Sequence, residues 1–207
     1  MKLIFDIGSN MGDFAKSCLV KYGFDTKIIC VDANPEIVRK IGSTMGSNIT
    51  VLNYAVASEN DVELDFYINR NAHVVSTLSQ DWMTKGRFAG GGWSPPIKVR
   101  TITLDKLIEL HGNPDYIKID VEGFEFEALK GLSKKSGLIS FEWTEELFDK
   151  TEKCIDKLKS IGYTEFSYTL EDPYNTIPDV FTSWEDCNIH SIIDRTQKLK
   201  WGMIFAR

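Results

Sequence analysis

Small and acidic residues follow two short apolar runs near the start of the chain. The first run leads into Asp6-Ile7-Gly8-Ser9-Asn10-Met11-Gly12, where Gly8 lets a backbone approach a ligand and Asn10 replaces the second glycine of the dinucleotide fingerprint. Asp32 ends the second run, at a position where an acid accepts hydrogen bonds from ribose hydroxyls. The negative charge of Asp6 would repel a pyrophosphate but would suit an ammonium group. These residues predict a site for a nucleoside with a cationic tail.

A second group of acids follows a later apolar run. Asp120 and Glu122 lie at and just past the end of this run, and side chains two residues apart in an extended chain point the same way. One of them could accept a proton from a reacting hydroxyl, although Glu122 could instead cap the next helix or pair with Lys118. Glu142 closes the next run, and three acids at neighbouring strand ends also suit magnesium. The sequence leaves a metal open, and turnover after EDTA treatment decides the question.

The three histidines differ in where a parallel sheet would place them. His111 precedes a strand, so it lies at the amino end of that strand and away from a site at the carboxyl ends. His73 and His190 lie in irregular segments that could reach the carboxyl edge, and imidazole is the commonest proton acceptor near neutral pH. We therefore take His73 as a candidate base and His190 as a candidate substrate contact.

The elements that must position these residues alternate between short apolar runs and segments of helical period, which indicates an α/β fold with a largely parallel sheet. Asn34-Pro35 predicts a helix start, because Asn caps helices and Pro fits the first helical position. The stretch 62–68 alternates apolar and polar residues, which predicts a half-exposed strand beside the sheet. Buried strands are expected over residues 3–7, 27–31, 50–54, 115–120, 138–142, 164–170 and 199–206. Further helices are expected after residue 12 and over residues 103–110, 124–132 and 147–161.

Two irregular segments, about residues 69–98 and 171–198, are expected to cover the edge of the sheet that carries the site. The first combines three consecutive glycines with Trp82, Phe88 and Trp93, as a lid over a ligand would, although a plain surface insertion has the same composition. Aromatic rings pack well on the apolar faces of sugars and equally well on other apolar acceptors. The candidate substrate contacts are Trp93, Glu142, Tyr174, Trp184 and His190.

Composition and charge disfavour several classes of function. The 207 residues, 43% of them hydrophobic, fit one globular domain over residues 1–207. Lys and Arg number 24 against 30 Asp and Glu, and the net charge of −6 argues against nucleic acid and anionic membranes as partners. No apolar run reaches the roughly 20 residues of a membrane span, and an acid interrupts the opening run too early for a secretory signal. The four cysteines lack any C-x-x-C spacing, so we expect buried thiols in a cytoplasmic protein.

Two motifs resemble those of S-adenosylmethionine-dependent methyltransferases of the FkbM family. The first family motif, D-x-G-x-N-x-G, is present as Asp6, Gly8, Asn10 and Gly12. The more specific motif, K-x-D-x-E-G-x-E followed by L-x-G, is present as Lys118, Asp120, Glu122, Gly123, Glu125, Leu129 and Gly131. Residues 101–105 resemble the T-x-T-L-D segment of the family, and residues 53–57 resemble the segment that meets the adenine. The resemblance runs from about Asp6 to Glu142, with Asp32 where the family usually carries Glu.

The resemblance implies a Rossmann-like class I methyltransferase fold, with a mostly parallel seven-stranded sheet, an antiparallel last strand and helices on both faces. It implies S-adenosylmethionine as the methyl donor and O-methylation of a sugar or glycan hydroxyl as the activity. It also favours His73 over His190 as a candidate base, because His73 precedes Ser76-Thr77-Leu78, where the family carries a substrate-side loop. The donor contacts that it implies are Asp6, Gly8, Ser9, Asn10, Asp32, Ala33, Ala55, Val56 and Asp120.

Three other functions stay under consideration at this point. A polyketide, a lipid or another small alcohol would suit the same aromatic residues as acceptor. Nucleic-acid methylation is disfavoured by the net charge and by Asp120-Val121-Glu122-Gly123, which does not resemble a D-P-P-Y loop. A module that binds the donor without turnover is disfavoured by the intact first motif. The sequence specifies neither the hydroxyl that is methylated nor the oligomeric state.

Overall fold

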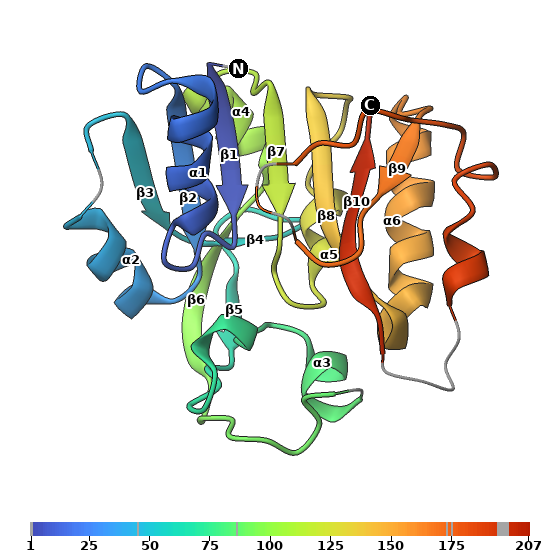
Figure 1. Ribbon diagram of the computed structural model, residues 1–207. Coiled ribbons are helices and arrows are strands. Elements are labelled where there is room, and N and C mark those ends of the chain that lie inside the picture. The colour runs from blue at the N-terminus through green and yellow to red at the C-terminus, as the bar shows by residue number, and fades with distance from the viewer. Residues whose placement is uncertain (1, 45, 86, 173, 175, 194–198) are drawn as a thin grey trace.

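Seven strands form one sheet in the order β3-β2-β1-β7-β8-β10-β9 in the computed structural model, which describes residues 2–44, 46–85, 87–172, 174, 176–193 and 199–207 (Figure 1). Neighbours from β3 to β8 are parallel, whereas β10 runs antiparallel to β8 and β9. The strands are β1 (Leu3–Ile7), β2 (Lys27–Asp32), β3 (Ile49–Asn53), β7 (Tyr116–Ile119), β8 (Leu138–Thr144), β9 (Phe166–Tyr168) and β10 (Trp201–Ala206). The fold class expected from the sequence, including the antiparallel last strand, is confirmed.

Helices cover both faces of this sheet because the buried strands present apolar side chains alternately to each side. Ile4 on β1 belongs to the core cluster on the sheet face that α1 and α2 cover. Phe5 belongs to the cluster on the opposite face, which α4, α5 and α6 cover. Asn34 caps α2 by accepting a hydrogen bond from the Glu36 amide at 3.0 Å, as the Asn-Pro pair predicts. The helices are α1 (Asp13–Tyr22), α2 (Pro35–Gly42), α4 (Leu104–His111), α5 (Glu125–Lys130) and α6 (Phe148–Ser160).

The direction in which the chain progresses through the sheet reverses beside β1. This strand pairs with β2 on one side and with β7 on the other, so the loops after β1 and β7 leave the same edge as neighbours. In open α/β sheets, ligands bind beyond the carboxyl ends of the strands at such a reversal. The fold therefore directs attention to the loops at residues 8–12 and 120–124.

A small second sheet leads into the segment that covers this edge. It has the order β4 (Ala55–Val56), β6 (Ile97–Ile102) and β5 (Glu63–Phe66). The predicted strand over 62–68 is thus present as β5, but it pairs with β6, a strand that was not predicted from the sequence and that begins at the end of the first irregular segment. The chain between β5 and β6, residues 67–96, is called the covering segment below. It contains the 3-10 helix η1 (His73–Val75) and the short helix α3 (Gln80–Thr84), drawn below the carboxyl ends of the parallel strands in Figure 1.

The segment between β9 and β10 was expected to cover the edge of the sheet, and part of it also pairs with β10. After β9 the chain pairs Glu171 with Gly202 and later forms the 3-10 helix η3 (Ile189–Ile192). Residues 173, 175 and 194–198, which belong to the second predicted irregular segment, lie outside the described residues. Within the described part of the chain, no helix combines the length and the apolar character that crossing a bilayer requires.

Candidate active site

The loops after β1 and β2 are joined through one carboxylate. Asp32, at the end of β2, accepts a hydrogen bond from the Asn10 amide at 2.8 Å on one oxygen and from the Asn34 amide at 2.8 Å on the other. Burial raises the pKa of Asp32, and these two backbone donors partly offset the rise. Two loops distant in sequence are therefore held side by side at the edge of the sheet.

Two adjoining clefts open at this edge. The first cleft lies between the ends of β1 and β2, the start of β4 and the covering segment. The second cleft, of about 410 Å³, lies on the side of β8 and β10, and this volume falls in the range of small-molecule sites. Both clefts are lined by Gly8, Asn10, Val74, Asp120 and Glu122. A ligand in one cleft can therefore meet a ligand in the other at these shared residues.

Most of the expected donor contacts line the first cleft, where apolar side chains form much of the remaining wall. The expected contacts found there are Gly8, Asn10, Asp32, Ala33, Ala55, Val56 and Asp120. Ser9 is buried beside them and does not line the cleft. Asn10 Oδ1 is buried and has no hydrogen-bond partner among the described residues, so it offers a free acceptor.

Asp6 lies elsewhere, which corrects its assignment as a donor contact. It stands inside β1 in register with Lys118 of β7, so both side chains lie on the sheet face that α1 covers. Its side chain is fully buried and lines neither cleft. Burial raises the pKa of Asp6 to about 7, although the Lys118 ammonium opposes the rise. The acid of the first motif therefore belongs to an internal charge network.

Lys118 is the centre of that network. Its Nζ lies 2.7 Å from Asp120 Oδ2 and 3.4 Å from Asp172 Oδ2, and only 4% of the residue is exposed. Burial alone would lower the pKa of Lys118, but the carboxylates of Asp120, Asp6 and Asp172 outweigh it and raise the pKa. The lysine of the second motif therefore fixes Asp120, and it also binds the segment that follows β9.

The turn after β7 has a backbone that few residues tolerate. Glu122 has a φ of 57° and Gly123 a φ of 82°, both in the left-handed region. Glu125 at the start of α5 accepts hydrogen bonds from the Val121 and Gly123 amides, each at 3.1 Å. Burial raises the pKa of Glu125 to about 7. The second motif thus encodes a braced turn that turns Glu122 toward the clefts.

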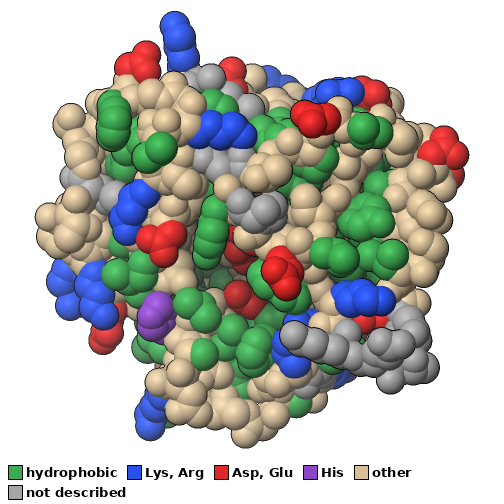
Figure 2. Space-filling model, in the orientation of Figure 1, with side chains coloured by type: hydrophobic (Ala, Val, Ile, Leu, Met, Phe, Trp, Pro, Cys, Tyr) green, Lys and Arg blue, Asp and Glu red, His purple; other side chains and the backbone are tan. Residues whose placement is uncertain are grey.

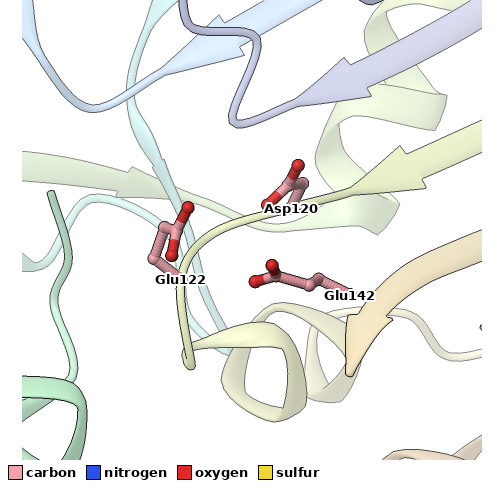
Figure 3. A group of neighbouring side chains, drawn as sticks. All are labelled: Asp120, Glu122 and Glu142. Atoms are coloured by element: carbon pink, nitrogen blue, oxygen red, sulfur yellow. The ribbon is translucent and has the colours of Figure 1, made fainter. Parts of the chain in front are cut away.

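Three carboxyl groups gather where the clefts meet. Asp120, Glu122 and Glu142 each offer an oxygen, and these oxygens lie within 4.8 Å of one another (Figure 3). Burial, followed by the neighbouring carboxylates, raises the pKa of Glu122 and of Glu142 well above the usual range of glutamate. Glu142 lies inside β8, two residues before its end, because the strand continues past the predicted boundary. The group can bind hydroxyls, accept a proton or hold a divalent cation.

Aromatic side chains form much of the wall around these acids in the second cleft. They are Trp82, Phe88, Tyr174 and Trp201. Figure 2 shows acidic side chains at the bottom of a hollow rimmed by hydrophobic ones. Asp172 adds a further carboxylate to the lining. Neither Trp201 nor Asp172 belongs to a sequence motif. They reach the cleft together because the neighbouring residues Glu171 and Gly202 pair with each other.

Arg87 is a cleft residue that the sequence reading did not single out. Its guanidinium binds both carboxylate oxygens of Glu146, at 2.7 and 2.8 Å, and donates to the Lys200 carbonyl at 3.1 Å. Glu146 belongs to the 3-10 helix η2 (Glu145–Leu147), next to β8. Such a paired, planar contact is strong and directional. It fastens the covering segment to the main sheet beside the second cleft.

The histidines and tryptophans that the sequence analysis considered lie in different parts of the structure. His73 lines the first cleft near Asp32, and it does not line the second cleft. His111 ends α4 and packs its ring edge-on against Phe5, away from the clefts as expected. Trp93 pairs with Asn69 in an isolated bridge and lines neither cleft.

Trp184 and His190 require a correction, because the structure places them against α6. The Trp184 indole donates to Glu152 Oε2 at 3.3 Å, and His190 Nε2 lies 3.3 Å from Glu152 Oε1. Trp184 is 5% exposed and packs against Phe166. Of the substrate contacts expected from the sequence, Glu142 and Tyr174 line the second cleft.

Comparisons with known proteins agree with this architecture. A family profile described as the Methyltransferase FkbM domain matches residues 6–164. No match was found among curated proteins. A solved structure titled Methyltransferase FkbM, from Methylobacillus flagellatus KT, is similar with a TM-score of 0.52 and 15% identity, over 100% of this chain and 43% of that chain.

Two further solved structures share the fold. Aeropyrum pernix fibrillarin, in complex with natively bound S-adenosyl-L-methionine, has a TM-score of 0.52 and 11% identity, over 100% of this chain and 66% of that chain. The S. pombe Dnmt2 methyltransferase has a TM-score of 0.50 and 11% identity, over 100% of this chain and 49% of that chain. The chain therefore spans less than two thirds of the length of each of these proteins.

Proposed function

This chain belongs to the FkbM methyltransferase family, and from that premise we propose that it transfers a methyl group from S-adenosylmethionine to a hydroxyl of a sugar or glycan. The family is S-adenosylmethionine-dependent, so the donor follows from membership. The hydroxyl acceptor is the proposal. The observation that carries it is the position of Glu122, a carboxylate with a raised pKa that lines both clefts.

The residues of the first cleft fit the donor. Asn10 Oδ1, buried and unpartnered among the described residues, suits the ammonium group. Each carboxylate oxygen of Asp32 accepts one backbone amide and keeps a further lone pair for a ribose hydroxyl. Apolar surface for the adenine comes from Ile37, Tyr54, Val56, Phe66 and Leu78. When bound, S-adenosylmethionine supplies a methyl group already activated by its sulfonium sulfur.

The chain must then align the acceptor and take its proton. Glu122 is the group that we assign to the proton. A carboxylate whose pKa is raised is a stronger base than an ordinary glutamate once it is deprotonated. Asp120, paired with Lys118 at 2.7 Å, stays beside it as a hydrogen-bond acceptor for the bound molecules.

The second cleft supports a sugar-like acceptor. Glu142 and Asp172 can accept hydrogen bonds from several hydroxyls, and the rings of Trp82 and Tyr174 can pack on the apolar face of a sugar. The same carboxylates would repel a phosphate-rich polymer, which argues against methylation of nucleic acid. Polyketide or lipid alcohols are the second choice, because the aromatic walls suit them, while a sugar offers the extra carboxylates more hydroxyls for its size.

A screen of acceptors with radiolabelled S-adenosylmethionine tests the proposal. Free sugars, glycans, polyketide and lipid alcohols, RNA and DNA are each incubated with the chain and with its Glu122→Gln variant. Transfer to a sugar or glycan hydroxyl by the wild type alone supports the proposal. Transfer to a nitrogen or carbon atom, or to nucleic acid, overturns it.

Isothermal titration addresses the remaining alternative, a module that binds the donor without turnover. Affinity for the donor without transfer to any acceptor class would favour that alternative. The small-molecule or glycan acceptor implied by the family resemblance stays a prediction. So do the cytoplasmic location and the absence of nucleic-acid and membrane partners, which were expected from composition.

A further inference from the structure

The left-handed backbone of Glu122 needs outside support. A non-glycine residue in this region is strained, and it persists only where its surroundings determine its conformation. The Glu122 carboxylate also lies next to those of Asp120 and Glu142, which repel it. Both effects favour a different conformation of the turn. Hydrogen bonds to the turn must therefore hold the carboxylate in place.

Two such hydrogen bonds end on the carbonyl groups of the turn. The Thr77 hydroxyl donates to the Glu122 carbonyl at 2.6 Å, across 45 positions of sequence. The Lys150 ammonium, from α6, donates to the Gly123 carbonyl at 3.2 Å and to Ser79 Oγ at 3.0 Å. Residues 77–79 and the turn are thus joined at two successive peptide groups.

Thr77 is itself held in place by burial and by hydrogen bonds of its backbone and its hydroxyl. It is fully buried, and its backbone exchanges two hydrogen bonds with Tyr67, at 2.9 and 3.0 Å. Its hydroxyl oxygen also accepts a hydrogen bond from the Ser79 amide at 2.8 Å. Because one lone pair is engaged by that amide, the hydroxyl proton is directed at the Glu122 carbonyl. Thr77 therefore links the backbone of the covering segment to the turn through hydrogen bonds that fix its position.

We propose that Thr77 is a positioning residue for methyl transfer, whose hydroxyl holds the Glu122 carboxylate in its working orientation and couples that orientation to the covering segment. This inference rests on the proposed role of Glu122. Thr77 lines neither cleft, so its loss acts through Glu122. Misplacing a reacting group by about 1 Å can cost on the order of 100-fold in rate.

The test uses the full chain with Thr77→Val, which removes the hydroxyl and keeps the shape, and Thr77→Ser, which keeps the hydroxyl. We expect kcat to fall about 10- to 100-fold in Thr77→Val and to recover in Thr77→Ser, on the scale of a misplaced reacting group. The Kd of the donor and the KM of the acceptor should stay near wild type. Thr77→Ala is the second hydroxyl-free variant for the case that valine is not tolerated.

Thr101→Val is the matched control. Thr101 is also buried, and its hydroxyl accepts a hydrogen bond from the Val62 amide at 3.0 Å in the small sheet. A merely structural loss would lower the melting temperature in both valine variants and leave kcat of the folded fraction unchanged. That outcome, or equal kcat for Thr77→Val and Thr77→Ser, overturns the proposal.

A double-mutant cycle separates this proposal from the proposed function. If Thr77 acts through Glu122, Thr77→Val has no further effect on kcat once Glu122→Gln is present. A full additional loss in the Glu122→Gln background would overturn the positioning role alone. If Glu122→Gln has wild-type kcat by itself, the proposed function of Glu122 fails, and the positioning role fails with it.

Discussion

The backbone carbonyl of Asp120 occupies the space where a side chain on Gly8 would begin. A Cβ built on Gly8 would lie 1.8 Å from that oxygen, and Gly8 has a φ of 78°. The loops after β1 and β7 therefore pass each other in van der Waals contact. Glycine in the first motif serves this crossing between strands, in addition to any contact with a ligand.

We predict that Gly8→Ala is strongly destabilised and loses donor binding, because the loop after β1 must move away from Asp120. Gly90→Ala is the matched control, since Gly90 has a φ of 79° but no atom within 4 Å of an added Cβ. Backbone strain alone costs on the order of 1 kcal/mol and is common to both variants. Urea unfolding measures the difference. Equal losses in the two variants would show that the contact with Asp120 is unimportant.

Asp32→Ala is expected to weaken donor binding by about 1.5–3 kcal/mol, the scale for losing hydrogen bonds to a charged group. The loss combines the ribose contacts with the release of the Asn10 and Asn34 amides. Isothermal titration gives the Kd. Asp65→Ala, which removes an exposed carboxylate on β5, is the control and should bind normally. An unchanged Kd for Asp32→Ala rejects its role in the first cleft.

Glu122→Gln should lower kcat by roughly 10²- to 10⁴-fold while donor affinity is retained, because the variant cannot accept a proton. His73→Ala should keep most of kcat, since His73 lines the first cleft and does not reach the second. Steady-state and single-turnover rates distinguish the two. The reverse pattern would make the base His73, which is one of the candidates that the sequence left open.

The raised pKa of Glu122 predicts how the rate depends on pH. A base works when deprotonated, so kcat/KM should rise with pH and its acid limb should lie above the usual glutamate pKa of 4.5. Glu142→Gln removes a neighbouring negative charge, so it should move this limb to lower pH. A limb that does not move in Glu142→Gln contradicts the coupling of the two carboxyl groups.

The raised pKa of Glu142 predicts an effect on stability. A carboxyl whose pKa is raised on folding contributes stability at low pH, and that contribution is lost as the pH rises above the unfolded pKa. Glu142→Gln stays neutral, so its melting temperature should exceed that of the wild type at pH 8 and approach it at pH 4. Glu109→Gln, on the exposed face of α4, is the control.

Tyr174→Ala is expected to raise the acceptor KM with little change in the Kd of the donor, because Tyr174 lines the second cleft and is 56% exposed. Trp184→Ala should instead destabilise the chain by about 3–5 kcal/mol, as the loss of a buried tryptophan does. Acceptor kinetics and thermal unfolding of both variants check this contrast. A raised acceptor KM for a stably folded Trp184→Ala would return Trp184 to the site.

Much of the architecture could be read from local patterns. Runs such as Leu3–Ile7 and Tyr116–Ile119 are almost entirely apolar, with Asp6 and Lys118 as the exceptions, because helices cover both sides of the sheet, and this marks them as central strands. The second motif pointed to Glu122 because its turn is built from neighbouring residues, with Glu125 bonding the amides of Val121 and Gly123.

Contacts between distant segments decided the rest. The motif placed Asp6 at the site, yet its register with Lys118 turns it into the interior. Asp172 reaches the second cleft, whereas Trp184, from the same irregular segment, packs against Phe166. Periodicity reports which face of an element is apolar, but the partner of that face depends on how the chain crosses the sheet. Residue types therefore determined the chemistry available to this protein, and tertiary packing determined which of those groups meet, because each contact joins segments that no local pattern connects.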